Sequence, residues 1–145
     1  MNLHYAELEK EGRISRIRSS PDEIRQIISL ADRDIKSAEF LITQNWDWAF
    51  SISYNAALQI SRAYMFSKGF RAASHEAHKN TFEFMKYSLG KEHELLVSFF
   101  DRMRQKRNRV IYEAAGIISE TEVKQLLKYS KEYIEIVKGK LVKYI

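Results

Sequence analysis

Apolar residues recur at alternating spacings of four and three along most of the chain, the pattern of a helix with one buried face. The first long stretch begins at Ser20-Pro21-Asp22-Glu23, which places serine at the N-cap, proline at the first helical position and a glutamate that completes a capping box. Its apolar stripe consists of Ile24, Ile28, Ala31, Ile35, Ala38 and Ile42. These residues predict a helix that ends near Gln44.

Four further segments carry the same period. They are residues 47–68, 74–89, 92–115 and 119–145. Each of the first three is followed by a glycine, the usual residue beyond a helix C-terminus, and the last opens with a second capping box at Ser119-Glu120-Thr121-Glu122. Small residues alternate with large ones over 47–68, so this helix is expected to approach its neighbours closely and to be the most buried.

The fold class predicted is all-α: an up-and-down four-helix bundle of long antiparallel helices with a short extra N-terminal helix. One domain is expected over residues 1–145, with 1–19 as an N-terminal extension and 20–145 as the bundle. The basic stretch that follows Gly12 is interpreted as an exposed connector, and no alternation typical of a strand is found. Only 5 glycines and 1 proline are present, which favours few, long elements.

The amino-acid composition excludes several classes of site and of protein. The absence of cysteine excludes disulfides and Cys-type zinc sites. No N-terminal apolar segment and no run near the roughly 20 residues of a membrane span appear, so a cytoplasmic protein without membrane association is expected. The net charge of +5 permits a phosphate-bearing partner but does not require one.

The segment 92–115 carries the most informative residues. Five of the eight residues from Arg102 to Arg109 are basic, whereas ordinary solvated faces mix charges of both signs. Arg107 follows Met103 by four residues and precedes Val110 by three, so it interrupts the apolar stripe. A charge there costs free energy unless it is paired, or unless it faces a cleft or a subunit boundary.

Arg104, Asn108 and Tyr112 form an adjacent row on the same helix, at spacings of four. A guanidinium, an amide and a phenol together suit phosphate and a nucleobase. A structural interpretation stays open beside this one. Arg107 could pair with a carboxylate on another helix or pack its stem, and Asn108 and Tyr112 could be structural hydrogen-bonding groups.

Other candidate sites are weaker. His75 and His78 lie three residues apart, but no third ligand accompanies them, so they are interpreted as exposed residues at a helix start, and neither a metal nor a cofactor is expected. The chain contains no glycine-rich phosphate loop. Trp46 and Trp48 are interpreted as packing anchors.

The basic helix in this setting resembles the HEPN superfamily of small helical-bundle proteins. The resemblance covers roughly residues 24–140 and rests on four segments. These are Asp32 to Leu41, Ser53-Tyr-Asn-Ala-Ala-Leu-Gln-Ile-Ser-Arg-Ala-Tyr64, Ser74-His-Glu-Ala77 and Arg107-Asn-Arg-Val-Ile-Tyr112. The last lies where the family carries its R-x-x-x-x-H signature.

The resemblance implies a homodimer in which two copies of that signature line a shared cleft. Active family members are metal-independent RNases, and many are encoded beside a minimal nucleotidyltransferase as toxin and antitoxin. Arg107 would then stabilise the scissile phosphate and Asn108 would support the site. Tyr112 stands in place of the histidine, and a phenol with a pKa near 10 does not suit proton transfer at neutral pH. The remaining cations of the run would attract nucleic acid; they are Arg102, Arg104, Lys106 and Arg109.

Three hypotheses follow for the function. The first is an RNA- or nucleotide-binding homodimer of toxin–antitoxin type, with Arg107 on phosphate and weak or no RNase activity. The alternative is a non-enzymatic interaction module that binds a cognate nucleotidyltransferase, in which the basic helix sets the register of the assembly. The third is an active metal-independent endoribonuclease that uses Arg107, Asn108 and Tyr112.

Overall fold

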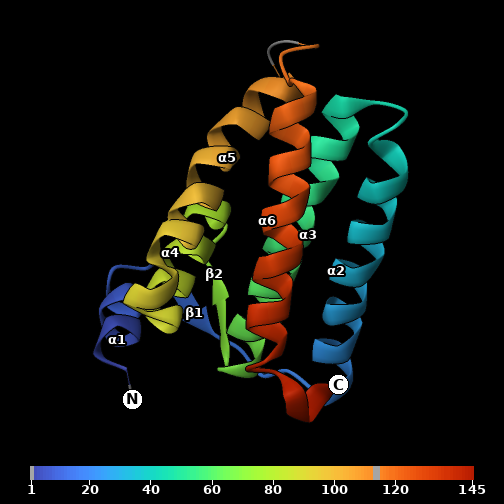
Figure 1. Cartoon of the computed structure of the whole chain (residues 1–145). Coiled ribbons are helices and arrows are strands. Elements are labelled where there is room, and N and C mark those ends of the chain that lie inside the picture. The colour runs from blue at the N-terminus through green and yellow to red at the C-terminus, as the bar shows by residue number, and fades with distance from the viewer. Residues whose placement is uncertain (1, 113–114) are drawn as a thin grey trace.

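The chain is mostly helical (Figure 1). The computed structural model describes residues 2–112, except the side chain of Tyr112, and residues 115–145. Its elements are α1 (Leu3–Lys10), β1 (Ile14–Arg16), α2 (Pro21–Leu41), α3 (Trp46–Ser67), β2 (Phe70–Ala72), α4 (Ala77–Leu89), α5 (Glu94–Tyr112) and α6 (Glu120–Lys138), with short 3-10 helices at Lys91–His93 and Val142–Tyr144. The helical class predicted from the periodicity is therefore confirmed in its main part.

The two predicted capping boxes are present and set the starts of α2 and α6. The hydroxyl of Ser20 accepts a hydrogen bond from the backbone N–H of Glu23 at 3.1 Å, and the Glu23 carboxylate accepts one from the backbone N–H of Ser20 at 3.3 Å. Ser119 and Glu122 make the same reciprocal pair, with both distances at 3.1 Å. Each box satisfies backbone donors that a helix start leaves without partners.

Helix α3 lies at the centre of the structure and packs against α2, α4, α5 and α6. Its small side chains at Ala56, Ala57, Ser61 and Ala63 are all fully buried, which lets neighbouring backbones come close. The prediction that this helix is the most buried is therefore confirmed.

Aromatic rings fill the core between α3 and the helices around it. The ring of Phe100 on α5 lies 5.9 Å from that of Phe82 on α4 and 4.8 Å from that of Tyr133 on α6, measured between centroids. The hydroxyl of Tyr133 is 2.6 Å from that of Ser61 on α3, and all of these side chains except Phe82 (1% exposed) are fully buried. Phe100 thus joins α5 to two helices at once.

A small two-stranded sheet was not predicted. β1 and β2 pair antiparallel, with Ser15 opposite Arg71, and Ile14 is buried, so the interpretation of this stretch as an exposed connector is wrong. Strands of three residues are too short to display alternation. Gly69 adopts a φ of +86°, the left-handed conformation that glycine reaches without strain, and this allows the chain to reverse from α3 into β2.

Three other boundaries and packing roles differ from expectation. Helix α6 ends at Lys138 rather than at the chain end, and α4 begins only at Ala77, because Glu76 before it has a left-handed φ of 54°. Trp46 and Trp48 are 43% and 61% exposed, so they are not packing anchors.

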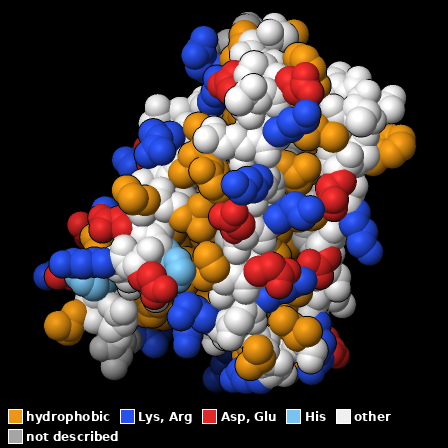
Figure 2. All heavy atoms as spheres, viewed as in Figure 1, with side chains coloured by type: hydrophobic (Ala, Val, Ile, Leu, Met, Phe, Trp, Pro, Cys, Tyr) orange, Lys and Arg blue, Asp and Glu red, His pale blue; other side chains and the backbone are white. Residues whose placement is uncertain are grey.

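Charges of both signs are interspersed over the face that α6 shares with its neighbours (Figure 2). Two ion pairs join α6 to α2, with Lys131 Nζ 3.3 Å from Glu39 and Lys138 Nζ 2.6 Å from Asp32. These two lysines of α6 are therefore matched by carboxylates of α2. Among the residues that the structure describes, no helix is long and apolar enough to cross a membrane.

Candidate nucleic-acid interface

Arg107 lies on the inward face of α5, about two turns after the buried Phe100. Met103 and Val110, which flank it, pack against the core, so the guanidinium interrupts an otherwise apolar surface as predicted. Its Cζ is 5.8 Å from the centroid of the Tyr54 ring on α3. Among the described residues Nε is buried without a hydrogen-bond partner, and Nη1 makes a long contact of 3.5 Å to Asn108 Oδ1.

The predicted alternative, in which Arg107 pairs with a carboxylate on another helix, has no support in the described part of the chain. No ion pair of Arg107 occurs among those residues. A half-buried cation whose Nε lacks a partner pays a desolvation cost of about 1–3 kcal/mol. The attraction between the cation and the Tyr54 ring offsets about 0.5–2 kcal/mol of it.

Tyr54 connects Arg107 to a histidine on α4. Its Oη is 3.1 Å from Nδ1 of His78. Burial raises the pKa of the Tyr54 phenol well above its usual range, although Arg107 and Arg104 act in the opposite direction. The phenol therefore keeps its proton near neutral pH.

The His78 imidazole is neutral in this environment. Its pKa is lowered, first by burial and then by the positive charges of Arg107 and Arg104. A protonated phenol can donate to Nδ1 or accept from it; we assign Tyr54 as the donor, which leaves the ring hydrogen of His78 on Nε2. The site thus holds two guanidinium groups, a phenol and a neutral imidazole.

The basic run of α5 does not form one surface, because a helix turns by about 100° per residue. Arg104 lies on the side of Tyr54 and His78, where its Nε also contacts Asp101 at 3.1 Å. Lys106 instead forms an ion pair with Glu122 of α6. Arg102 and Arg109 are both exposed. The side chain of Tyr112 lies outside the described residues.

Tyr54 and His78 are the site residues that sequence analysis missed. His78 was interpreted as an exposed residue at a helix start, but it is half-buried. A signal was present: His78 precedes Phe82 by four residues and Met85 by seven, and both are buried, so all three share the inner face of α4. Within the described ranges no three His, Cys, Asp or Glu side chains gather in a way that could hold a metal.

These observations define a mostly helical domain in which a half-buried arginine of α5 has no carboxylate partner among the described residues. The family model described as the HEPN domain matches residues 24–140, a stretch that includes Tyr54, His78 and Arg107. The chain therefore belongs to the HEPN family. A search of curated proteins finds no match.

The lowered pKa of His78 predicts how stability depends on pH. Because the unfolded chain binds this proton more readily, the free energy of unfolding should fall as the pH drops below about 6.5 and level off below the folded-state pKa. His78→Gln should lose this part of the dependence, as measured by urea unfolding at several pH values. His75→Gln, which changes an exposed histidine, should retain the wild-type profile. Identical profiles for wild type and His78→Gln would contradict the assignment of a buried neutral imidazole.

Proposed function

We propose that this protein is an RNA- or nucleotide-binding HEPN domain whose Arg107 contacts phosphate. One observation carries the proposal: Arg107 is a half-buried cation with an unpartnered Nε, and no carboxylate pairs with it in the described part of the chain. A phosphate oxygen would supply the missing acceptor, and the planar guanidinium suits two oxygens at once.

The groups around Arg107 support contact with a nucleotide. Arg104 adds a second positive charge near Tyr54 and His78, and Asn108 supplies an amide beside the guanidinium. Arg102 and Arg109 are exposed and add sequence-independent attraction for a polyanion. Lys106 contributes less to this attraction, because its charge is matched by Glu122.

The assembly that we propose is a cytoplasmic homodimer of toxin–antitoxin type, built on an up-and-down bundle of the long helices. An exposed hollow at the end of α5 supports a subunit contact there, because the large apolar residues Trp48 and Ile111 line it and are 61% and 41% exposed. A surface of this kind also suits a nucleotidyltransferase partner. Light scattering of the purified chain measures the mass directly, and a monomer would argue against the homodimer.

Metal-independent RNA cleavage is a second candidate, and His78 is the observation that favours it. As the base, His78 would use its other tautomer, in which Nδ1 carries the hydrogen and donates it to Tyr54 Oη, so that the unprotonated Nε2 can accept the proton of a ribose 2′-hydroxyl. The 2′-oxygen would then attack the adjacent phosphorus, and the bond from phosphorus to the 5′-oxygen would break. The 5′-oxygen would leave as a hydroxyl with a proton taken from water, and a 2′,3′-cyclic phosphate would form. Arg107 would stabilise the charge on the phosphate oxygens. This candidate places the proton transfer on α4 rather than at Tyr112.

The experiment that tests the proposal measures binding of a single-stranded RNA by fluorescence anisotropy between about 50 mM and about 300 mM salt. The affinity should fall steeply, with a slope in log–log form of about −0.7 for each phosphate neutralised. The same samples, kept in EDTA, report cleavage. Absence of salt-sensitive binding at the lowest ionic strength would refute RNA binding.

A further inference from the structure

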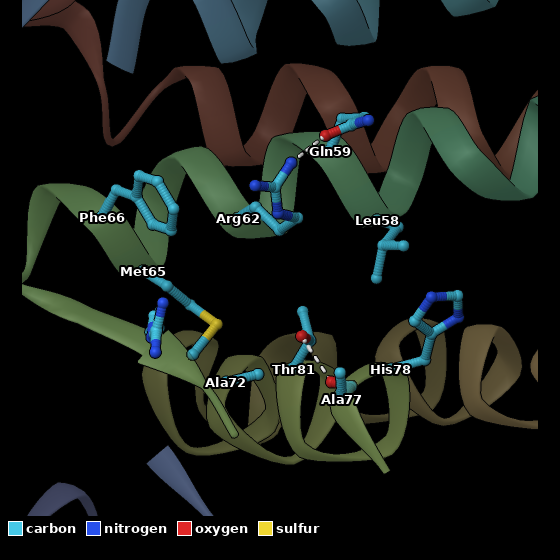
Figure 3. Close-up of a pocket in the computed structure, with 10 residues that line it drawn as sticks. Leu58, Gln59, Arg62, Met65, Phe66, Ala72, Ala77, His78 and Thr81 are labelled. Carbon is cyan, nitrogen blue, oxygen red and sulfur yellow. Dashed lines mark hydrogen bonds between the residues drawn. The ribbon is translucent and has the colours of Figure 1, made fainter. Parts of the chain in front are cut away.

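A cationic pocket lies beside His78, and Arg107 is not among the residues that line it. It is a cavity of about 360 Å³ between α3, β2 and the start of α4. Figure 3 shows Leu58, Arg62 and Phe66 of α3 on one side and Ala77, His78 and Thr81 of α4 on the other. Its volume is at the lower end of the range for pockets that hold small ligands.

Arg62 is the unusual residue of this pocket. Its side chain is half-buried, and burial lowers the pKa of the guanidinium. Nη1 donates to Gln59 Oε1 at 2.6 Å, and Cζ lies 5.4 Å from the Phe66 ring centroid. No carboxylate pairs with Arg62 among the residues described. One neutral hydrogen bond and one ring contact leave most of the five guanidinium donors free for a ligand.

Two further donor groups face the same cavity. Arg71 of β2 lines it, is exposed, and has no carboxylate partner in the described ranges. The neutral His78 presents its Nε2 hydrogen, because Nδ1 is occupied by Tyr54. Thr81 is not available as a donor, since its hydroxyl already donates to the carbonyl of Ala77 at 2.8 Å. None of the described residues that line this pocket is acidic.

We propose that this pocket binds a terminal phosphate monoester, held by the guanidinium groups of Arg62 and Arg71 and by the His78 imidazole. A phosphate monoester carries up to two negative charges and three free oxygens, which matches two cations from separate elements. A planar carboxylate is satisfied by one guanidinium, so a pocket with two guanidinium groups fits a phosphate better than a carboxylate. Leu58, Met65 and Phe66 supply apolar wall for the attached group.

The pocket is a site separate from Arg107. Arg62 follows Tyr54 on α3 by just over two turns, about 12 Å along the helix axis. A free nucleoside monophosphate and the phosphorylated end of an RNA strand share the chemistry required. In an RNA strand, the terminal phosphate would bind on one side of His78 and the phosphate that Arg107 contacts would lie on the other side. The pocket would therefore recognise the end of the strand.

The test compares oligoribonucleotides that carry a phosphate at one end with the same strands ending in hydroxyl groups, by isothermal titration calorimetry on the full chain. The phosphorylated strand should bind about tenfold more tightly or better, the effect of a charge-assisted contact. In Arg62→Gln and in Arg71→Gln the ratio of the two affinities should fall to about one. Arg71 is exposed, so its replacement also tests the pocket should Arg62→Gln fail to fold. Arg25→Gln, at an exposed arginine of α2, is the control and should keep the ratio.

Competition with other probes identifies the source of the phosphate. Displacement by a nucleoside monophosphate, but not by citrate at equal concentration, would support the pocket and show that it also takes a free nucleotide. A ratio of one in the wild type, a ratio unchanged in both pocket variants, or equal displacement by citrate would overturn the proposal. Arg107→Met should lower the affinity for both strands while preserving the ratio, and direct titration with the monophosphate tests the pocket even if RNA does not bind. Failure of the pocket is therefore distinguishable from failure of the proposed function.

Discussion

Arg107→Met is expected to weaken RNA binding by roughly 10- to 100-fold, the effect of losing a charged contact worth about 1.5–3 kcal/mol. The same substitution should raise the free energy of unfolding by about 1 kcal/mol. Methionine keeps an apolar stem between Met103 and Val110 but removes the buried Nε that has no partner. The desolvation cost removed is about 1–3 kcal/mol and the attraction to the Tyr54 ring that is lost is about 0.5–2 kcal/mol, so the difference is a net gain of about 1 kcal/mol.

Opposite changes in affinity and stability would separate a binding role from a structural one. A residue retained for packing loses stability when it is replaced, whereas a residue retained for a ligand often gains it. RNA anisotropy, urea unfolding and light scattering on the same sample give the three readouts. Arg25→Met removes one exposed positive charge elsewhere and should change the stability by less than about 0.5 kcal/mol. Loss of the dimer with unchanged RNA affinity would instead favour the interaction-module hypothesis.

Local chemistry explains why most helix boundaries could be predicted. Each capping box involves residues only three apart, so the local sequence around Ser20 and Ser119 is enough to predict where the helices begin. The start of α4 could not be read in this way, because Glu76 adopts a positive φ for which glutamate gives no signal. The strands β1 and β2 depend on pairing between segments more than fifty residues apart, and Ser15 and Arg71 carry no local sign of it.

The residues of the candidate site differ in the same way: those marked by the pattern of one helix could be predicted, and those that depend on contacts between helices could not. Arg107 was predicted because its break in the apolar stripe is a property of one helix. The contact between Tyr54 and His78 joins α3 to α4, and periodicity identifies the buried face of each helix but not which side chains meet across it. The grouping of Lys106 with Arg107 ignored the rotation of the helix, and its ion pair with Glu122 places it on another side of α5.

Phe100→Ala is expected to lower the free energy of unfolding by about 3–5 kcal/mol, the usual cost of removing a fully buried phenylalanine side chain. The effect should be near the upper end, because the ring contacts Phe82 on α4 and Tyr133 on α6, and neither helix can move into the space without losing its own contacts. Leu95→Ala on the same helix is the matched control. Leu95 is 86% exposed, and its replacement should change the stability by less than about 0.5 kcal/mol.

The consequence for binding follows from the position of Phe100, about two turns before Arg107 on the inward face of α5. Without the ring, α5 loses one of its contacts with α4 and its contact with Tyr133 of α6, so the position of Arg107 relative to Tyr54 and His78 is held less firmly. RNA affinity measured well below the unfolding transition should therefore fall in Phe100→Ala and stay at the wild-type value in Leu95→Ala. A Phe100→Ala protein that unfolds with wild-type stability would contradict the packing described for the core. One that is destabilised but binds RNA normally would show that the α4–α5 contact does not position the site.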